Sequence, residues 1–124
     1  MSETHGALLA RFFECWKNSD LDGALAMVEE DAVFEPDLKG TRHQGKNDLR
    51  VLWGTYMDLM QSYHCEILSV LENDRQAMVE RLEVIGSSEG VEMRLPLVGV
   101  FAISKAGRIA SWRDYWDTSM APAH

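Results

Sequence analysis

The spacing of the hydrophobic residues changes at Tyr63, and this change limits the possible folds more than any other feature of the sequence. Before Tyr63, apolar residues recur three or four positions apart, whereas after it they mostly alternate along the chain. The first spacing matches the turn of an α-helix and the second matches the two faces of a β-strand. The sequence therefore predicts a helical first half followed by a sheet.

Three helices are expected before residue 63. The first spans residues 3–18, and Ser19 and Asp20 provide a break and a cap for a short second helix. A short strand at 32–34 and a loop at 38–40 come next, and a third helix follows Gly45, with Asn47 or Asp48 as its cap. The apolar stripes of the three helices, which predict core or pocket wall, are Leu8, Leu9, Phe12, Phe13 and Trp16; Leu21, Ala24, Leu25 and Val28; and Leu49, Leu52, Trp53, Tyr56, Met57 and Met60.

Four long strands are expected after residue 63, at 64–72, 76–86, 91–104 and 108–117, with turn signals between them. Their short connections favour an antiparallel meander and exclude a doubly wound sheet. We therefore predict one α+β domain over residues 1–124. Its three helices pack in the concavity of a strongly curved, mainly antiparallel sheet with a pocket between the layers, and its last six residues are frayed.

The charge of the chain argues against two classes of partner. The net charge is -8, and no two Lys or Arg residues are adjacent. Nucleic acids and anionic membranes both need a basic surface, so neither is expected. The N-terminus has no signal-peptide pattern, and no apolar run approaches the roughly 18 residues of a membrane span. Cys15 and Cys65 lack metal-ligand spacing and are expected to be buried thiols of a cytoplasmic protein.

Alternation along the third and last long strands predicts a buried carboxylate. In the third strand, one face carries only apolar residues and glycine, from Met93 to Ile103, and is therefore the inner face. In the last strand, Asp114 lies between Trp112 and Trp116 on one face. A buried carboxylate without a partner costs several kcal/mol, so Asp114 is expected to have a partner or a chemical task. The alternative is that Asp114 caps a loop near the sheet edge.

The second long strand supplies a possible partner. Alternation places Arg81 and Glu83 on one face with Ala77, Val79 and Ile85, although the opposite face is equally apolar. Facing inward, the pair would form a carboxylate–guanidinium–carboxylate group with Asp114. One arginine can hold two carboxylates in different protonation states, as acid–base catalysis at neutral pH requires. The alternative is a surface ion pair.

No other motif predicts chemistry. His43 in a polar loop and His64 at a strand start are expected at the surface or partly buried rather than acting as bases. The sequence contains no glycine-rich phosphate loop, zinc-type spacing or nucleophile elbow. No cofactor and no metal site are therefore expected.

Three segments resemble limonene epoxide hydrolases, which belong with SnoaL-like proteins to the nuclear transport factor 2-like superfamily. The segments are Leu95–Ser104, Gly107–Asp117 with its Trp-Arg-Asp-Tyr-Trp-Asp sequence, and Glu80–Val84 with its Glu-Arg-Leu-Glu-Val sequence. The resemblance covers about half of the chain, and the helical half matches only in layout. It implies the cone-shaped fold of that superfamily and a homodimer formed through the outer sheet face.

Carried over by position, the resemblance assigns three catalytic residues. Asp114 matches the base that activates water, Arg81 matches the arginine between two carboxylates, and Glu83 matches the acid that protonates the epoxide oxygen. The family has Asp where this chain has Glu83, and the added methylene moves the carboxyl group by roughly 1.5 Å. A displacement of that size can cost about a hundredfold in rate. The Tyr and Asn with which the family holds the water are also absent from residues 34–37, where Glu35 and Asp37 are the polar candidates.

The resemblance, together with the predicted group of Arg81 and two carboxylates, implies a hydrolase that adds water to a small apolar epoxide without a cofactor. One alternative is a SnoaL-like isomerase or cyclase with Asp114 as its base, and the other is a non-catalytic domain that binds a small ligand. The expected substrate-binding residues are Phe34, Leu95, Leu97, Phe101, Trp112 and Trp116.

Overall fold

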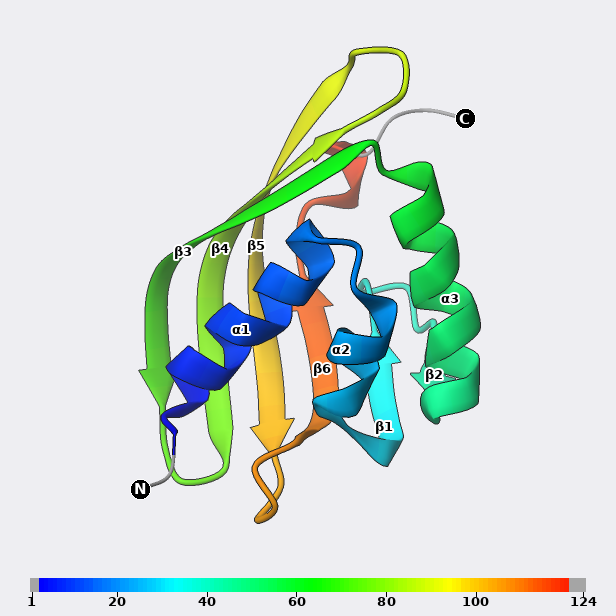
Figure 1. Ribbon diagram of the computed structural model, residues 1–124. Helices are drawn as coiled ribbons and strands as arrows, with labels where there is room; N and C mark the ends of the chain where they lie inside the picture. The colour runs from blue at the N-terminus through cyan, green and yellow to red at the C-terminus, as the bar shows by residue number, and fades with distance from the viewer. Residues whose placement is uncertain (1–2, 121–124) are drawn as a thin grey trace.

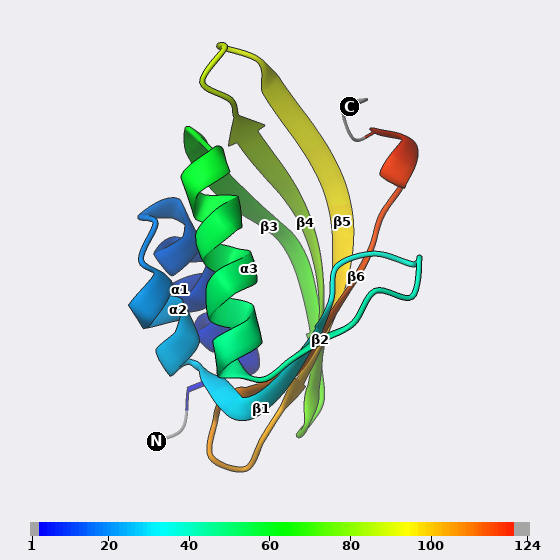
Figure 2. The same ribbon diagram turned by 90° about the vertical axis from the view of Figure 1, so that its right-hand side faces the viewer.

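Three helices cover one face of a curved, six-stranded sheet in the computed structural model, which describes residues 3–120 (Figures 1 and 2). The predicted α+β class and the helix-in-concavity arrangement are confirmed. The elements are α1 (His5–Lys17), α2 (Leu21–Ala26), β1 (Val28–Glu35), β2 (His43–Gln44), α3 (Lys46–Leu59), β3 (Ser62–Glu72), β4 (Gln76–Gly86), β5 (Glu92–Ile103), β6 (Ile109–Tyr115) and a 3₁₀ helix (Thr118–Met120).

The strands lie in the order β2-β1-β6-β5-β4-β3. Strands β3 to β6 form the predicted antiparallel meander, and β1 joins the sheet parallel to β6. The first strand is longer than the predicted 32–34, and the two-residue strand β2 was not predicted. Val28, assigned to the second helix, instead begins β1, because its buried side chain lies in the sheet next to Ile109. A β-branched residue fits this position well.

The caps of the second and third helices differ in kind. As predicted, Asp20 caps α2, and its carboxylate accepts a hydrogen bond from the Gly23 N–H at 2.9 Å. The predicted cap of the third helix at Asn47 or Asp48 is wrong, since Gly45 occupies that position with φ 92°. Glycine adopts this conformation without strain, and the chain can turn sharply from β2 into α3.

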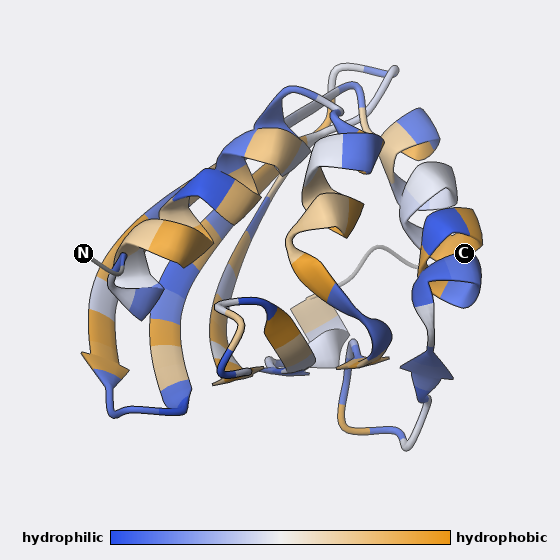
Figure 3. Cartoon of the chain, turned by 60° about the horizontal axis from the view of Figure 1, so that its bottom comes forward, coloured by the Kyte–Doolittle hydropathy of each residue, from blue (hydrophilic) through white to orange (hydrophobic). Residues whose placement is uncertain are grey.

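Aromatic rings from both layers form the centre of the core. Phe12 and Trp16 of α1 and Trp53 of α3 pack edge to face with neighbouring rings, and each lies within 6.2 Å of Trp112 of β6, measured between ring centroids. Figure 3 shows hydrophobic and hydrophilic residues alternating along the strands, as expected for a sheet with one covered face. The concave face of the sheet is therefore packed against the helices by aromatic side chains.

The predicted inner face of β5 is confirmed from Leu95 to Ile103. In β6 the alternation holds for Trp112 and Asp114 but fails at Ile109, which is also buried. The cause is a bulge, because Ser111 pairs with Ala102 and Ile109 with the next residue, Ile103. One extra residue in β6 returns the side chain of Ile109 to the inner face.

Two further predictions concern the ends of the chain and the membrane. Part of the segment predicted to fray lies in the 3₁₀ helix, and residues 121–124 lie outside the described residues. Within residues 3–120, the structure contains no helix with both the length and the hydropathy needed to cross a membrane.

Candidate active site

Arg81 is fully buried and binds two carboxylates. Its Nη2 donates to Oδ1 and Oδ2 of Asp114 at 2.9 and 2.8 Å, and its Nε donates to Oε2 of Glu83 at 3.1 Å. Asp114 is 5% exposed and Glu83 is 9% exposed. The structure therefore brings together all three residues that the sequence analysis grouped, and it excludes both the loop cap and the surface ion pair.

The three side chains come from strands that are not all adjacent. Arg81 and Glu83 lie on β4 and Asp114 on β6, so Arg81 has to cross β5 to reach Asp114. At the crossing, the residue of β5 paired with Asp114 is Gly99. A Cβ at that position would lie 2.8 Å from Nη1 of Arg81 and 3.0 Å from Oδ1 of Asp114. Gly99 thus leaves the space that the guanidinium occupies.

Two aromatic residues complete the hydrogen bonds of the carboxylates. The hydroxyl of Tyr63 donates to Oε2 of Glu83, and Nε1 of Trp112 donates to Oδ1 of Asp114, each at 2.7 Å. Arg81 also lies 5.0 Å from the ring centroid of Phe13. The sequence analysis placed Trp112 only in a pocket wall and did not select Tyr63. The available signal was position, because Trp112 lies two residues from Asp114 and Tyr63 is the second residue of β3, which pairs with β4.

Burial and neighbouring charges both shift the pKa values of the ionisable groups, and they oppose each other at Asp114 and Arg81. Burial raises the pKa of Asp114 to about 6, against the lowering effect of Arg81. Burial disfavours the charge of Arg81, but Asp114 and Glu83 together hold its pKa above the ordinary value. Burial and the nearby Glu83 raise the pKa of Tyr63 well above its ordinary value. At pH 7 the site therefore combines an ionised Asp114, a cationic Arg81 and a neutral Tyr63.

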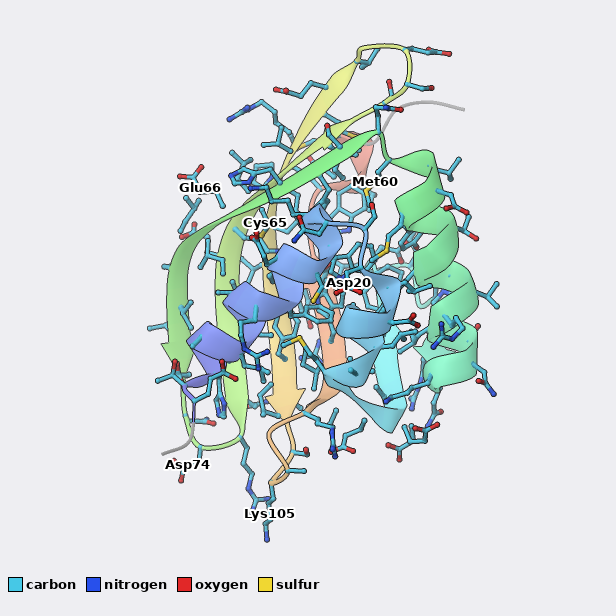
Figure 4. The ribbon with its side chains drawn as sticks, viewed as in Figure 1. Asp20, Met60, Cys65, Glu66, Asp74 and Lys105 are labelled. Atoms are coloured by element: carbon cyan, nitrogen blue, oxygen red, sulfur yellow. The ribbon has the colours of Figure 1, made fainter. Side chains whose placement is uncertain are left out.

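Both carboxylates line a pocket of about 280 Å³ between the sheet and the helices. Five of the six predicted substrate-binding residues line it too: Phe34, Leu95, Leu97, Trp112 and Trp116. Phe101 does not, because its fully buried ring stacks on Trp112 at 5.4 Å in the core. Tyr56 and Met60 also line the pocket, and Figure 4 shows Met60 where α3 leads into β3.

The two histidines considered as bases and the two cysteines do not line this pocket. His43 is on β2, where its Nδ1 is 3.5 Å from the Asp48 carboxylate, and His64 is exposed on β3. Cys15 and Cys65 are free and half-buried, rather than fully buried as predicted. Burial raises the pKa of Cys65 to about 12. In Figure 4, Cys65 lies beside α1, whereas Glu66 points away from the helices. Residues 3–120 contain no group of three His, Cys, Asp or Glu arranged to hold a metal ion.

Comparisons with known proteins agree with this architecture. The model of the SnoaL-like domain family matches residues 9–112. No curated protein has a significantly similar sequence. Among solved structures, an LEH-like epoxide hydrolase from M. tuberculosis is 22% identical with a TM-score of 0.79, and the match covers 90% of this chain and 81% of that one.

Two further structures show the range of proteins with this fold. An epoxide hydrolase/cyclase-like enzyme of pyran ring formation in the polyether salinomycin is 17% identical with a TM-score of 0.82, and the match covers 93% and 92% of the two chains. A Mycobacterium tuberculosis protein in complex with estradiol-17beta-hemisuccinate is 19% identical with a TM-score of 0.81, covering 91% and 93%. At these identities the similarity shows the fold alone.

Proposed function

Because this chain belongs to the SnoaL-like domain family, we propose that its pocket is an active site, and that it adds water to a small apolar epoxide without a cofactor. The observation that carries the proposal is that buried Arg81 holds Asp114 and Glu83 together at the wall of an apolar pocket. Epoxide opening needs a base for the water and an acid for the oxygen that leaves carbon, and this arrangement offers one carboxyl group for each.

Asp114 is the base in this scheme. With a pKa of about 6 it is ionised at pH 7, and its basicity exceeds that of an ordinary aspartate. It takes one proton from water as the water oxygen forms a bond to an epoxide carbon. Since water is the nucleophile, no bond forms between the protein and the substrate.

Glu83 is the acid. As the carbon–oxygen bond of the epoxide breaks, Glu83 gives its proton to that oxygen, and the product is a diol. Arg81 and Tyr63 both donate to Oε2, so in this scheme the proton is given from the other oxygen, Oε1. Asp114 then releases its proton to solvent and Glu83 takes one up from solvent, which restores the starting state.

The other two functions have less support from this geometry. An isomerase or cyclase that relies on Asp114 alone needs a single carboxylate in an apolar pocket, whereas here Arg81 ties Asp114 to a second carboxylate. A domain that only binds apolar ligands does not need buried charges, which are costly to desolvate. The pocket volume of about 280 Å³ favours a substrate at the small end of the range for ligand sites.

The test is turnover of terpene and cycloalkene epoxides by the wild type, Asp114→Asn and Glu83→Gln. We expect both variants to lose at least about 100-fold in kcat/KM. Glu66→Gln, which changes an exposed glutamate on the opposite side of the sheet from the pocket, should keep wild-type activity. In a single turnover in ¹⁸O-water, the diol should carry the label from the solvent. No turnover by the wild type, or unchanged turnover by Asp114→Asn, would overturn the proposal.

The predicted homodimer also stays a proposal. Met78, Val98 and Tyr115 expose apolar surface on the outer face of the sheet, where a second copy would pack. Sedimentation velocity of the wild type and of Met78→Glu should show a dimer and a monomer, respectively. A monomeric wild type at all concentrations would contradict the proposal.

A further inference from the structure

The two carboxylate oxygens of Glu83 have different surroundings. Oε2 accepts hydrogen bonds from the Tyr63 hydroxyl at 2.7 Å and from Nε of Arg81 at 3.1 Å, whereas Oε1 accepts none from any residue within 3–120. In the same part of the chain, the fully buried side-chain atoms without a partner belong to Trp16, Trp53 and Arg81, so Oε1 is not closed off. Because Glu83 lines the pocket, Oε1 is the oxygen that is open to a bound molecule.

The two donors on Oε2 decide where an acid proton can sit. A lone pair that accepts a hydrogen bond cannot also carry a proton. Arg81 keeps its charge and remains a donor. Burial and the nearby Glu83 raise the pKa of Tyr63 well above its ordinary value, so the hydroxyl keeps its hydrogen. With both donors in place, the proton of Glu83 is held on Oε1, whereas with Arg81 alone one lone pair of Oε2 would also be open to it.

Tyr63 reaches Glu83 diagonally across the sheet. Strand β3 lies beside β4, where Cys65 pairs with Glu83 and Tyr63 pairs with Ile85 (Figure 1). Diagonal neighbours of this kind are about 7–8 Å apart, a distance that an aromatic and a long side chain bridge together. The ring of Tyr63 is 7% exposed and packs against Trp16 of α1, with 6.0 Å between the ring centroids. The helix layer therefore fixes the tyrosine that in turn fixes the carboxyl group.

The length of Glu83 is part of this contact. An aspartate at position 83 would hold its carboxyl group about 1.5 Å closer to its own strand. The hydrogen bond of 2.7 Å to Tyr63 would then be lost, since the ring of Tyr63 is held by the core and cannot follow. The glutamate and the tyrosine are thus matched in length across the two strands.

We propose that Tyr63 is the positioning residue of the acid: together with Arg81 it occupies Oε2 of Glu83, which keeps the carboxyl group from rotating and holds its proton on Oε1. This assignment rests on the proposed epoxide hydrolysis, because it needs Glu83 as the acid. It has a consequence for substitutions at position 83. Glu83→Asp keeps an acid but loses the tyrosine, so it should lose rate.

The experiment is a double-mutant cycle of the wild type, Tyr63→Phe, Glu83→Asp and the double variant, with kcat and KM measured on a cycloalkene epoxide. We expect Tyr63→Phe to lower kcat about 10-fold and to change KM less than about threefold. Glu83→Asp should lower kcat about 10- to 100-fold. In the Glu83→Asp background, Tyr63→Phe should change kcat less than about twofold, because the hydroxyl no longer reaches the acid.

Ser69→Ala is the matched control. Ser69 also lies on β3 and donates its hydroxyl to a carboxylate of β4, Oε1 of Glu80 at 2.9 Å, but this hydrogen bond is exposed. Its loss should leave kcat and KM at the wild-type values. The control separates a loss of the acid's position from a general weakening of the contact between β3 and β4.

Each outcome of the cycle decides the assignment. Wild-type kcat in Tyr63→Phe or in Glu83→Asp would overturn it and leave the proposed function intact. A raised KM with unchanged kcat would also overturn it, because the hydroxyl would then bind substrate. Equal losses from Tyr63→Phe in both backgrounds would show that the hydroxyl acts only through the stability of the fold. No turnover of any epoxide by the wild type would overturn the proposed function and this assignment together.

Discussion

At Gly99, the lack of a side chain decides whether Arg81 reaches Asp114. Arg81 on β4 and Asp114 on β6 are separated by β5, and any Cβ on the inner face of β5 at this point would meet both groups. The positions on either side, Leu97 and Phe101, carry large side chains that line the pocket or fill the core. The absence of a side chain at this one position of an apolar strand therefore leaves the room in which Arg81 and Asp114 form their ion pair.

We expect Gly99→Ala to weaken both the fold and the activity. The added methyl group would lie 2.7 Å from a ring carbon of Phe101 and 2.8 Å from Nη1 of Arg81. Overpacking of this kind costs about 1–3 kcal/mol of unfolding free energy, which urea denaturation can measure. Gly6→Ala is the control, because its Cβ meets no atom closer than 3.6 Å and alanine favours the helix. Equal stability of the two variants would contradict the role of Gly99.

The raised pKa of Asp114 predicts two pH dependences. The ionised form is the base, so kcat/KM should fall below about pH 6. Because its pKa is raised, the Asp114 carboxyl group binds its proton more tightly in the folded protein than in the unfolded chain. The contribution of Asp114 to stability is thus fully present below about pH 4 and is lost as the pH rises through about 6.

Unfolding free energies of the wild type and Asp114→Asn at pH 4, 5, 6 and 7 test this direction, because the pH effects of other groups largely cancel in the difference. The stability of the wild type relative to the variant should decrease over this range. An increase would mean that Arg81 outweighs burial and that the pKa of Asp114 is lowered instead.

At the scale of elements, α1 depends on β3 for part of its N-terminal cap. Thr4 caps the helix by accepting the Ala7 N–H at 3.1 Å, but the first turn has no acidic residue. The Glu72 carboxylate at the end of β3 accepts the N–H groups of His5 and Gly6 at 3.1 and 3.3 Å. A carboxylate here satisfies free N–H groups and matches the positive end of the helix dipole. The contact fixes the helix that carries Phe12, Phe13 and Trp16 against the sheet.

Glu72→Ala should therefore destabilise the protein by about 0.5–1 kcal/mol without changing kcat. The loss should shrink in high salt, because the contact is exposed and partly electrostatic. Glu66→Ala removes an exposed glutamate from the same strand that has no hydrogen bond within residues 3–120, and it should have no effect on stability. Thermal unfolding of the two variants at low and high salt distinguishes a cap from a general charge effect.

At the scale of the whole molecule, one buried arginine and two buried carboxylates interrupt an aromatic core. Burying charges costs free energy that their mutual attraction only partly returns. The same residues form the proposed active site. We therefore expect that apolar residues of similar size could replace them without loss of stability, but with loss of activity.

Arg81→Met should lower the unfolding free energy by about 3–5 kcal/mol, because it leaves two buried carboxylates without the cation that balances their charge. The triple variant Arg81→Met/Glu83→Leu/Asp114→Leu should be at least about as stable as the wild type and have no activity. Chemical denaturation and epoxide turnover measure the two effects. A triple variant that is clearly less stable than the wild type would show that the charges contribute net stability.

Much of this molecule follows from local rules that act along the sequence. The change of period at Tyr63 predicts three helices and a meander, and alternation predicts that Asp114 faces inward, because both patterns only require one face to be covered. Alternation also puts Arg81 and Glu83 on one face of their strand, but the structure was needed to show that this face is the inner one. The predicted end of the second helix near Val28 and the predicted cap of the third helix were less accurate. Val28 pairs with Ile109 of β6, which is far away in sequence, and Gly45 caps α3 at the turn that follows β2. The bulge at Ile109 is also set by a partner strand rather than by its own segment.

Only the tertiary structure decided which inward-facing groups meet. Tyr63 reaches Glu83 because β3 and β4 pair in one register, and Trp112 reaches Asp114 because both lie on the same face of β6. Phe101 was expected in the pocket and lies in the core, since alternation gives a face but not a depth along the strand. Tyr56 and Met57 belong to one stripe predicted to be core or pocket wall, and the structure places Tyr56 in the pocket wall and Met57 in the core. Sequence periodicity determines on which face a side chain lies, whereas its distance from another side chain depends on register, crossing and helix position, which the whole core sets together.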